Sequence, residues 1–161
     1  MLSAKTNGQS VTNLRRYEMN DSSSGPVQVL GAYGAAVHEK DVEAFMALYD
    51  QGARVYDTWG VWSYEGTASR RKAIEGWFSS LGEEGVKVSF DEVQVMVDQE
   101  LAVLTATGRY AAFSADGVEL RSMQNRFTWA LKRKEGEWKI VHEHTSVPIG
   151  DSDLKAILQR S

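Results

Sequence analysis

Apolar residues recur at helical spacing directly after Pro26. Val27, Leu30, Gly34 and Val37 follow the period of about 3.6 residues that marks one face of an amphipathic helix. A proline suits the first turn of such a helix, because its missing N–H would have no partner there in any case. The pattern predicts a first helix beginning at Pro26.

Two further helices are predicted before the pattern changes. Asp41 is expected to cap the second one, since an aspartate side chain can accept a hydrogen bond from the first helical turn. A third helix is predicted over residues 68–81, and a short strand over residues 53–57 lies between the two. Their apolar stripes consist of Val42, Phe45, Met46 and Tyr49 in the second helix, and Ile74, Trp77, Phe78 and Leu81 in the third.

From Val86 onward the hydrophobic period is two, which is typical of strands. Apolar residues alternate from Val86 to Phe90, and the apolar parity then switches for Val93 to Val97. Such a switch predicts a bulge or a bend. Three more strands are predicted over residues 101–114, 120–134 and 138–148, joined by hairpin turns at 115–118 and 134–137.

Three helices followed by a long, bent antiparallel sheet predict an α+β domain in which the sheet curls around the helices. The chain has 161 residues, which fits one domain, placed at residues 26–149. Residues 1–25 are polar and rich in Ser and Asn, so they are interpreted as a mobile N-terminal arm. Residues 150–161 are interpreted as a C-terminal tail, with spacing compatible with a short helix.

Composition excludes several classes of function. The chain has no cysteine, which excludes disulfides, thiolate metal sites and cysteine nucleophiles. The net charge of −4 argues against broad nucleic-acid binding, and the basic clusters 70–72 and 132–134 are interpreted as solvated surfaces. No apolar run approaches the length of about 20 residues that spans a bilayer. We therefore expect a cytoplasmic protein with neither nucleic-acid nor membrane partners.

Four stretches of the chain resemble the ketosteroid isomerases and their SnoaL-like relatives, within the nuclear transport factor two-like superfamily. They are residues 32–49, 53–60, 126–131 (RFTWAL) and 136–146 (GEWKIVHEHTS). The resemblance implies a cone-shaped, curved antiparallel sheet wrapped around three N-terminal helices, with one internal pocket for a small molecule and no cofactor. It does not select a reaction, because this fold carries isomerases, cyclases, dehydratases, hydrolases and non-catalytic association domains.

The resemblance also implies two catalytic residues. Tyr33 falls where the isomerases hold the tyrosine that donates to the developing oxyanion, and Asp57 falls where they hold the general base. The spacing, 57 − 33 = 24 residues, agrees with the family without a gap. The second oxyanion donor of the isomerases, a protonated aspartic acid, should fall within residues 124–128, which contain no acid. Arg126 or Thr128 stands nearest, so a steroid isomerase in the strict sense is not expected.

Six residues are predicted to bind the substrate: Trp59, Tyr110, Arg126, Thr128, His142 and His144. His142 and His144 share one face of the last strand, where they could bind a metal, hold a proton near neutral pH, line a pocket or be structural. No third ligand can be placed beside them, so no metal is expected. Arg126 would suit an anionic ligand if it faces the pocket, and it could equally lie on the outer face of the sheet.

These observations favour a proton-transfer enzyme of the isomerase, cyclase or dehydratase type, acting on a small carbonyl-containing or hydroxylated substrate. A non-catalytic binding protein and an association module are the alternatives. A homodimer is also expected, because Phe127, Trp129 and Leu131 form an apolar face that would be open on a monomer in one of the two possible sheet orientations.

Overall fold

The structure, a computed structural model, describes residues 15–16 and 25–160. Most of the predicted N-terminal arm therefore lies outside the described residues. None of the helices in the described part is long and apolar enough to cross a membrane. The described residues form three helices and seven strands: β1 (Arg15–Arg16), α1 (Gln28–Glu39), α2 (Val42–Ala47), β2 (Tyr49–Tyr56), β3 (Tyr64–Glu65), α3 (Gly66–Ser80), β4 (Gly85–Asp98), β5 (Leu101–Phe113), β6 (Glu119–Lys134) and β7 (Glu137–Ser146).

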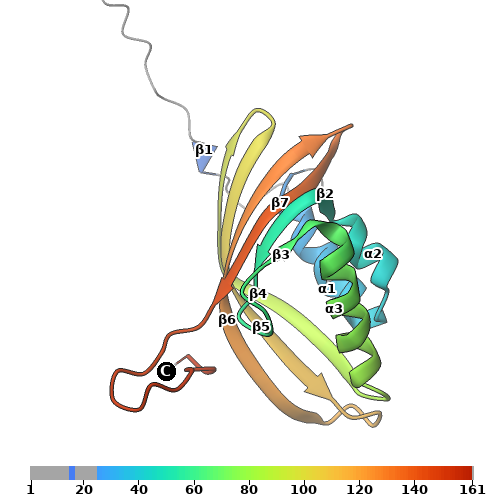
Figure 1. The fold of residues 1–161 in the computed structure, drawn as a ribbon, viewed down its shortest axis with the longest axis vertical. Coiled ribbons are helices and arrows are strands. Elements are labelled where there is room, and N and C mark those ends of the chain that lie inside the picture. The colour runs from blue at the N-terminus through green and yellow to red at the C-terminus, as the bar shows by residue number, and fades with distance from the viewer. Residues whose placement is uncertain (1–14, 17–24, 161) are drawn as a thin grey trace, which may run out of the picture.

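All the strands belong to one sheet, with the order β1-β4-β5-β6-β7-β2-β3. The long strands β4 to β7 curl along one side of the molecule, and the three helices lie against the concave face (Figure 1). This arrangement confirms the predicted α+β fold with a sheet wrapped around N-terminal helices. One pairing was not predicted: β2 runs parallel to β7, while the other neighbouring strands are antiparallel.

Local signals in the sequence coincide with local features of the structure. The register of β4 against β5 shifts between Asp91 and Gln94, where the apolar parity changes, which confirms the predicted bulge. Asp41 caps α2 by accepting a hydrogen bond from Ala44 N at 2.9 Å. The two predicted hairpin turns are present and contain Gly117 and Gly136, with φ angles of 81° and 88° that favour glycine.

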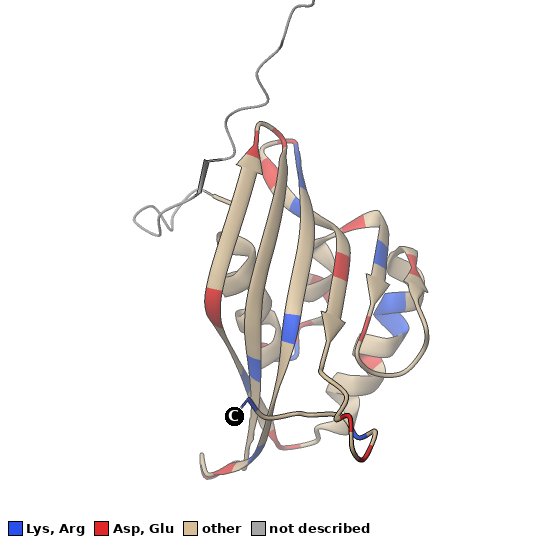
Figure 2. Ribbon diagram, turned by 90° about the vertical axis from the view of Figure 1, so that its left-hand side faces the viewer, with Lys and Arg blue, Asp and Glu red and all other residues tan. Residues whose placement is uncertain are grey.

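The inner face of the sheet packs on the helices and forms the core. Phe127, Trp129 and Leu131 of β6 point inward and are at most 2% exposed. The reason given for a homodimer is therefore wrong, because this apolar face is covered by the protein's own helices. The alternate residues Arg126 and Thr128 face outward and are exposed, on the convex side of the sheet that Figure 2 shows.

The predicted short helix in the C-terminal tail is wrong. Residues 151–153 form a turn and the rest of the tail is irregular, with one bridge between Ile149 and Ala156. The apolar residues Leu154 and Ile157 are 78% and 46% exposed, so they have no core to pack against. A short helix without tertiary packing is marginal in water, and this backbone forms hydrogen bonds partly within the tail and partly with Pro148 and Gln124.

Candidate active site

A cavity of about 720 Å³ lies between α3 and the inner face of the sheet. One side of α3 lines it with Arg70, Ile74 and Trp77, and β5 contributes Tyr110 to the sheet side. Most of the remaining wall is apolar or aromatic. The cavity is large enough for a small organic molecule, since ligand pockets have volumes of roughly 300–1,000 Å³.

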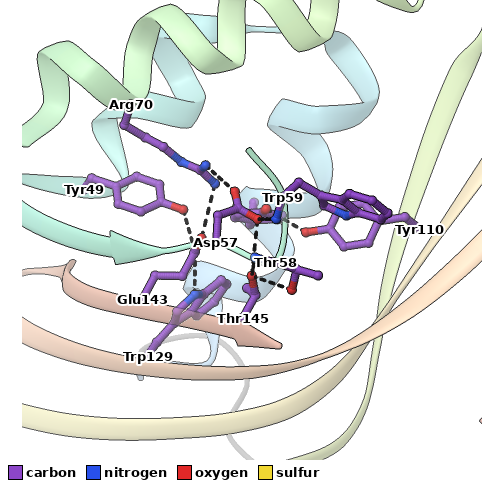
Figure 3. A network of polar contacts seen from close by, with 10 residues as sticks. Tyr49, Asp57, Thr58, Trp59, Arg70, Tyr110, Trp129, Glu143 and Thr145 are labelled. Carbon is purple, nitrogen blue, oxygen red and sulfur yellow. Dashed lines mark hydrogen bonds and ion pairs between the residues drawn. The ribbon is translucent and has the colours of Figure 1, made fainter. Parts of the chain in front are cut away.

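Asp57 enters the cavity directly after the end of β2. Because β2 is parallel to β7, the turn after β2 lies beside the end of β7, and Thr145 comes within reach of Asp57. The Thr145 hydroxyl donates to Asp57 Oδ1 over 3.3 Å, and Trp59 N donates to the same oxygen over 3.2 Å. Arg70 Nη1 donates to Asp57 Oδ2 (Figure 3). The side chain of Asp57 is 17% exposed, so it is partly buried.

Arg70 lies between two carboxylates. Its Nη1 pairs with Asp57, its Nη2 donates to Glu143 Oε1 over 3.2 Å, and its side chain is 7% exposed. The interpretation of residues 70–72 as a solvated surface is thus wrong for Arg70. Burial alone would lower the pKa of Arg70, but Glu143 and the other neighbours outweigh it and hold this pKa above its ordinary value. The guanidinium is therefore a fixed positive charge in the wall of the cavity.

Glu143 is the most deeply buried acid of the site. Its Oε2 accepts hydrogen bonds from the Tyr49 hydroxyl at 2.6 Å and from Trp129 Nε1 at 2.7 Å (Figure 3). Burial raises the pKa of Glu143, and Arg70 and the Tyr49 hydroxyl offset this only in part. Together with Arg70, Glu143 anchors α3 to β7 at the base of the cavity.

Two tyrosine hydroxyls meet at the cavity wall. Tyr33 comes from α1 and Tyr110 from β5, and their oxygens lie 2.7 Å apart. Burial, followed by the charge of Glu143, raises the pKa of Tyr33; burial also raises the pKa of Tyr110. Both hydroxyls are therefore neutral at physiological pH. One hydrogen bond between two hydroxyls uses one of their two protons, so the second proton can be donated to a ligand.

The structure brings four of the predicted site residues together. Tyr33, Asp57, Trp59 and Tyr110 all line the cavity.

The structure places the other four predicted residues elsewhere. Arg126, Thr128, His142 and His144 do not line this cavity, so their predicted positions in the pocket are wrong. The period of two explains the error, because Phe127 and the other inward residues of the same strands fill the concave face. On the outer face, the rings of His142 and His144 lie 5.1 and 5.8 Å from the ring of Tyr56.

Sequence reasoning missed six polar residues of the cavity: Arg70, Arg121, Ser122, Asn125, Glu143 and Thr145. Simple spacing could have indicated two of them. Arg70 precedes Ile74 by one helical turn on the apolar stripe of α3, and Asn125 has the same parity as Phe127 on β6. Among the described residues, the buried side-chain atoms without a hydrogen-bond partner are Arg70 Nε and Asn125 Oδ1. Both belong to residues of the cavity wall.

Comparison with known proteins gives a family match for most of the chain. A family model described as a SnoaL-like domain matches residues 27–150. An NTF2-like protein of unknown function from Pseudomonas putida has a similar structure, with a TM-score of 0.73 and 20% identity over 83% of this chain and 92% of that one. Comparison of the sequence with curated proteins gives no match.

Two further solved structures carry functional descriptions. A candidate dehydratase of the NTF2-like family from Streptomyces avermitilis matches with a TM-score of 0.62 and 18% identity, over 74% of this chain and 90% of that one. A candidate ketosteroid isomerase from Shewanella frigidimarina matches with a TM-score of 0.60 and 18% identity, over 77% and 96%. At this level of identity the structural matches show a shared fold.

Proposed function

Because the chain belongs to the SnoaL-like domain family, we propose that it is an enzyme that moves a proton on a small carbonyl-containing or hydroxylated substrate held in the cavity. One observation carries the proposal: the carboxylate of Asp57 and the hydroxyl pair of Tyr33 and Tyr110 line the same, largely apolar cavity. A base and a neutral hydrogen-bond donor that reach one small ligand are the minimum set for proton transfer next to an oxygen function.

Asp57 is assigned the role of base. A carboxylate offers about four acceptor positions, and Asp57 uses three of them for Arg70, Trp59 N and Thr145. The remaining position is free to accept a proton from the substrate. The three protein donors fix the carboxylate in one orientation, which is what efficient general base catalysis requires of its base.

The hydroxyl pair is assigned the role of electrophile. When a proton leaves the carbon next to a carbonyl, negative charge develops on the carbonyl oxygen, and a hydroxyl already in place stabilises that charge. The free proton of the Tyr33–Tyr110 pair can provide this hydrogen bond. The apolar wall around it, which includes Ile74 and Trp77, keeps the local dielectric low and so strengthens the interaction.

Isomerisation, cyclisation and dehydration can all begin with this step, and the candidate dehydratase and candidate ketosteroid isomerase of the same fold are consistent with it. The alternative is a binding protein without turnover. The hydrogen bonds that occupy Asp57 favour this alternative, because they would also suit a carboxylate that only organises the pocket.

The proposal is tested with 2-tetralone, a bicyclic ketone with acidic protons next to its carbonyl, followed by NMR in D2O. We expect the wild type to exchange these protons faster than buffer, and Asp57→Asn to reduce the enzymatic rate by roughly 100-fold or more. Asp50→Asn is the matched control, because Asp50 pairs with Lys134 at the surface. Binding of the ketone without any exchange in the wild type would favour the non-catalytic alternative.

A further inference from the structure

The cavity extends along α3 between two ends. Arg70 lies at one end, and Leu81, the C-cap of α3, lines the other end. The two residues are separated by 81 − 70 = 11 positions, which corresponds to about 16 Å at the rise of an α-helix. Around Leu81 the wall continues with Val86 and Ala112, which are paired across β4 and β5. Arg121, which is paired with Ala112 across β5 and β6 and forms an ion pair with Glu84, also lines the cavity on this side, as does Ser122. A ligand that fills this cavity therefore meets apolar side chains between two polar regions.

Residues 147–160, here called the C-terminal strap, return to the sheet beyond the end of β7. The last residue pair between β6 and β7 joins Arg126 to Ser146, which leaves the outer part of β6 without β7 beside it. The strap takes that place. Gln124 N donates to Leu158 O at 2.8 Å, and Gln159 Nε2 donates to Ser122 O at 2.5 Å.

The strap is fixed at further points. Arg160 N donates to the side chain of Gln124 at 2.9 Å, and Ile157 N donates to Pro148 O at 2.9 Å. These contacts hold the strap at both its beginning and its end. Position 158 therefore has a defined place against β6.

Among the strap's residues, all of which the structure describes, Leu158 is the residue that lines the cavity. Leu158 is half-buried, whereas Leu154 and Ile157 are 78% and 46% exposed. It lies at the level of Met123 and Gln124 on β6. Met123 is four residues, or about 13 Å of strand, from Phe127, which is paired with Thr145, and Met123 itself is paired with Tyr110 on β5.

Residues 151–160 of the strap, which include Leu158, lie outside the part of the chain that the family model matches, since that match ends at residue 150. Leu158 thus contributes to the cavity wall from outside the matched domain. We propose that Leu158 is a specificity-determining residue, which forms the cavity wall beside β6 and limits the length of the apolar part of a substrate that carries one hydroxyl or carbonyl group. This inference rests on the proposed function and names its substrate class.

A series of 4-alkylphenols, from 4-ethylphenol to 4-octylphenol, measures the length of the cavity without requiring turnover. In the wild type we expect the association constant to rise about fourfold with each added methylene until the chain meets Leu158, and then to level off or fall. In Leu158→Ala the rise should continue for one or two more methylenes, and in Leu158→Trp it should stop earlier. Calorimetry gives the affinities directly.

Leu154→Ala is the matched control, since it removes the same side chain from an exposed position of the strap. It should leave the length limit unchanged. If affinity stops rising at the same alkyl length in the wild type, Leu158→Ala and Leu158→Trp, the role of Leu158 is overturned while the proposed function stays intact. Failure of every phenol to bind the wild type would instead count against the proposed function, and the inference would fall with it.

Discussion

The hydroxyl oxygens of Tyr33 and Tyr110 lie 2.7 Å apart and are joined by a hydrogen bond, although the two residues are 77 positions apart in the chain. The bond links α1 to β5 at the wall of the cavity. It has a structural consequence, since the two hydroxyls hold the helix to the sheet, and a chemical one under the proposed function, in which they donate a proton to the substrate.

A double-mutant cycle separates these consequences. Tyr33→Phe and Tyr110→Phe should each lower the free energy of unfolding by about 1 kcal/mol, because each leaves one buried hydroxyl without its partner. The double variant should lose less than the sum of the two, since both partners are then absent. Urea unfolding measures the three values. Additive losses would show that the two hydroxyls do not interact.

Asp57→Asn should destabilise the protein by about 1–3 kcal/mol, because Arg70 would lose a charged acceptor while Glu143 remains as its partner. Urea unfolding near neutral pH checks this value. Asp50→Asn, which removes a surface pair with Lys134, should change stability by less than about 1 kcal/mol. An Asp57→Asn protein as stable as the wild type would mean that the pair with Arg70 has no net effect on folding.

The raised pKa of Glu143 predicts a pH dependence of stability. The folded protein favours the neutral carboxyl, so this contribution is complete below the unfolded value of about 4.3 and is lost as the pH rises through the raised folded pKa. The wild type should therefore lose stability relative to Glu143→Gln as the pH rises through this window, by at most about 1.4 kcal/mol per pH unit. Denaturant unfolding at several pH values gives the difference.

Glu84 provides a control of the opposite sign. The hydrogen bond from Arg121 lowers the pKa of Glu84, so its contribution is present above the unfolded value and is lost on acidification. The wild type should thus gain stability relative to Glu84→Gln as the pH rises. A difference of the same sign for both variants would contradict the role of burial at Glu143.

Gly108 of β5 lies directly against the ring of Phe127 of β6. A Cβ at Gly108 would lie 2.3 Å from Phe127 Cε2, so Gly108→Ala should cost about 1–3 kcal/mol as the phenyl ring is displaced. In Gly31→Ala, by contrast, the new methyl has no atom within 4 Å, and an alanine in α1 should stabilise by about 0.5–1 kcal/mol. Thermal unfolding distinguishes the two signs, and equal effects would contradict the close contact.

Much of the fold could be predicted from the sequence because its signals are local. The stripe of α3, the cap at Asp41 and the parity switch between Phe90 and Val93 each depend on neighbouring residues. What the period of two could not decide is which side of a strand faces inward. Because of this ambiguity, the prediction placed Arg126 in the pocket and left Asn125 out of it.

The core of the site was missed for a different reason. Arg70 was interpreted as part of a solvated cluster, because a charged residue is exposed unless a partner is known. Its partners, Asp57 and Glu143, are 13 and 73 residues away in the chain. Only the parallel pairing of β2 with β7 brings those two carboxylates together. The spacing of apolar residues along the sequence does not indicate such a long-range pairing.

The pairing of β2 with β7 also bears on how the protein forms during synthesis. Tyr49 meets Glu143, and Asp57 meets Thr145, across separations of 94 and 88 residues. While the ribosome is still making β4, β5 and β6, one edge of β2 has no strand to pair with, and contacts of such high sequence separation form slowly. A nascent chain arrested before β7 should therefore lack the ion pair between Arg70 and Glu143 and expose an edge open to aggregation.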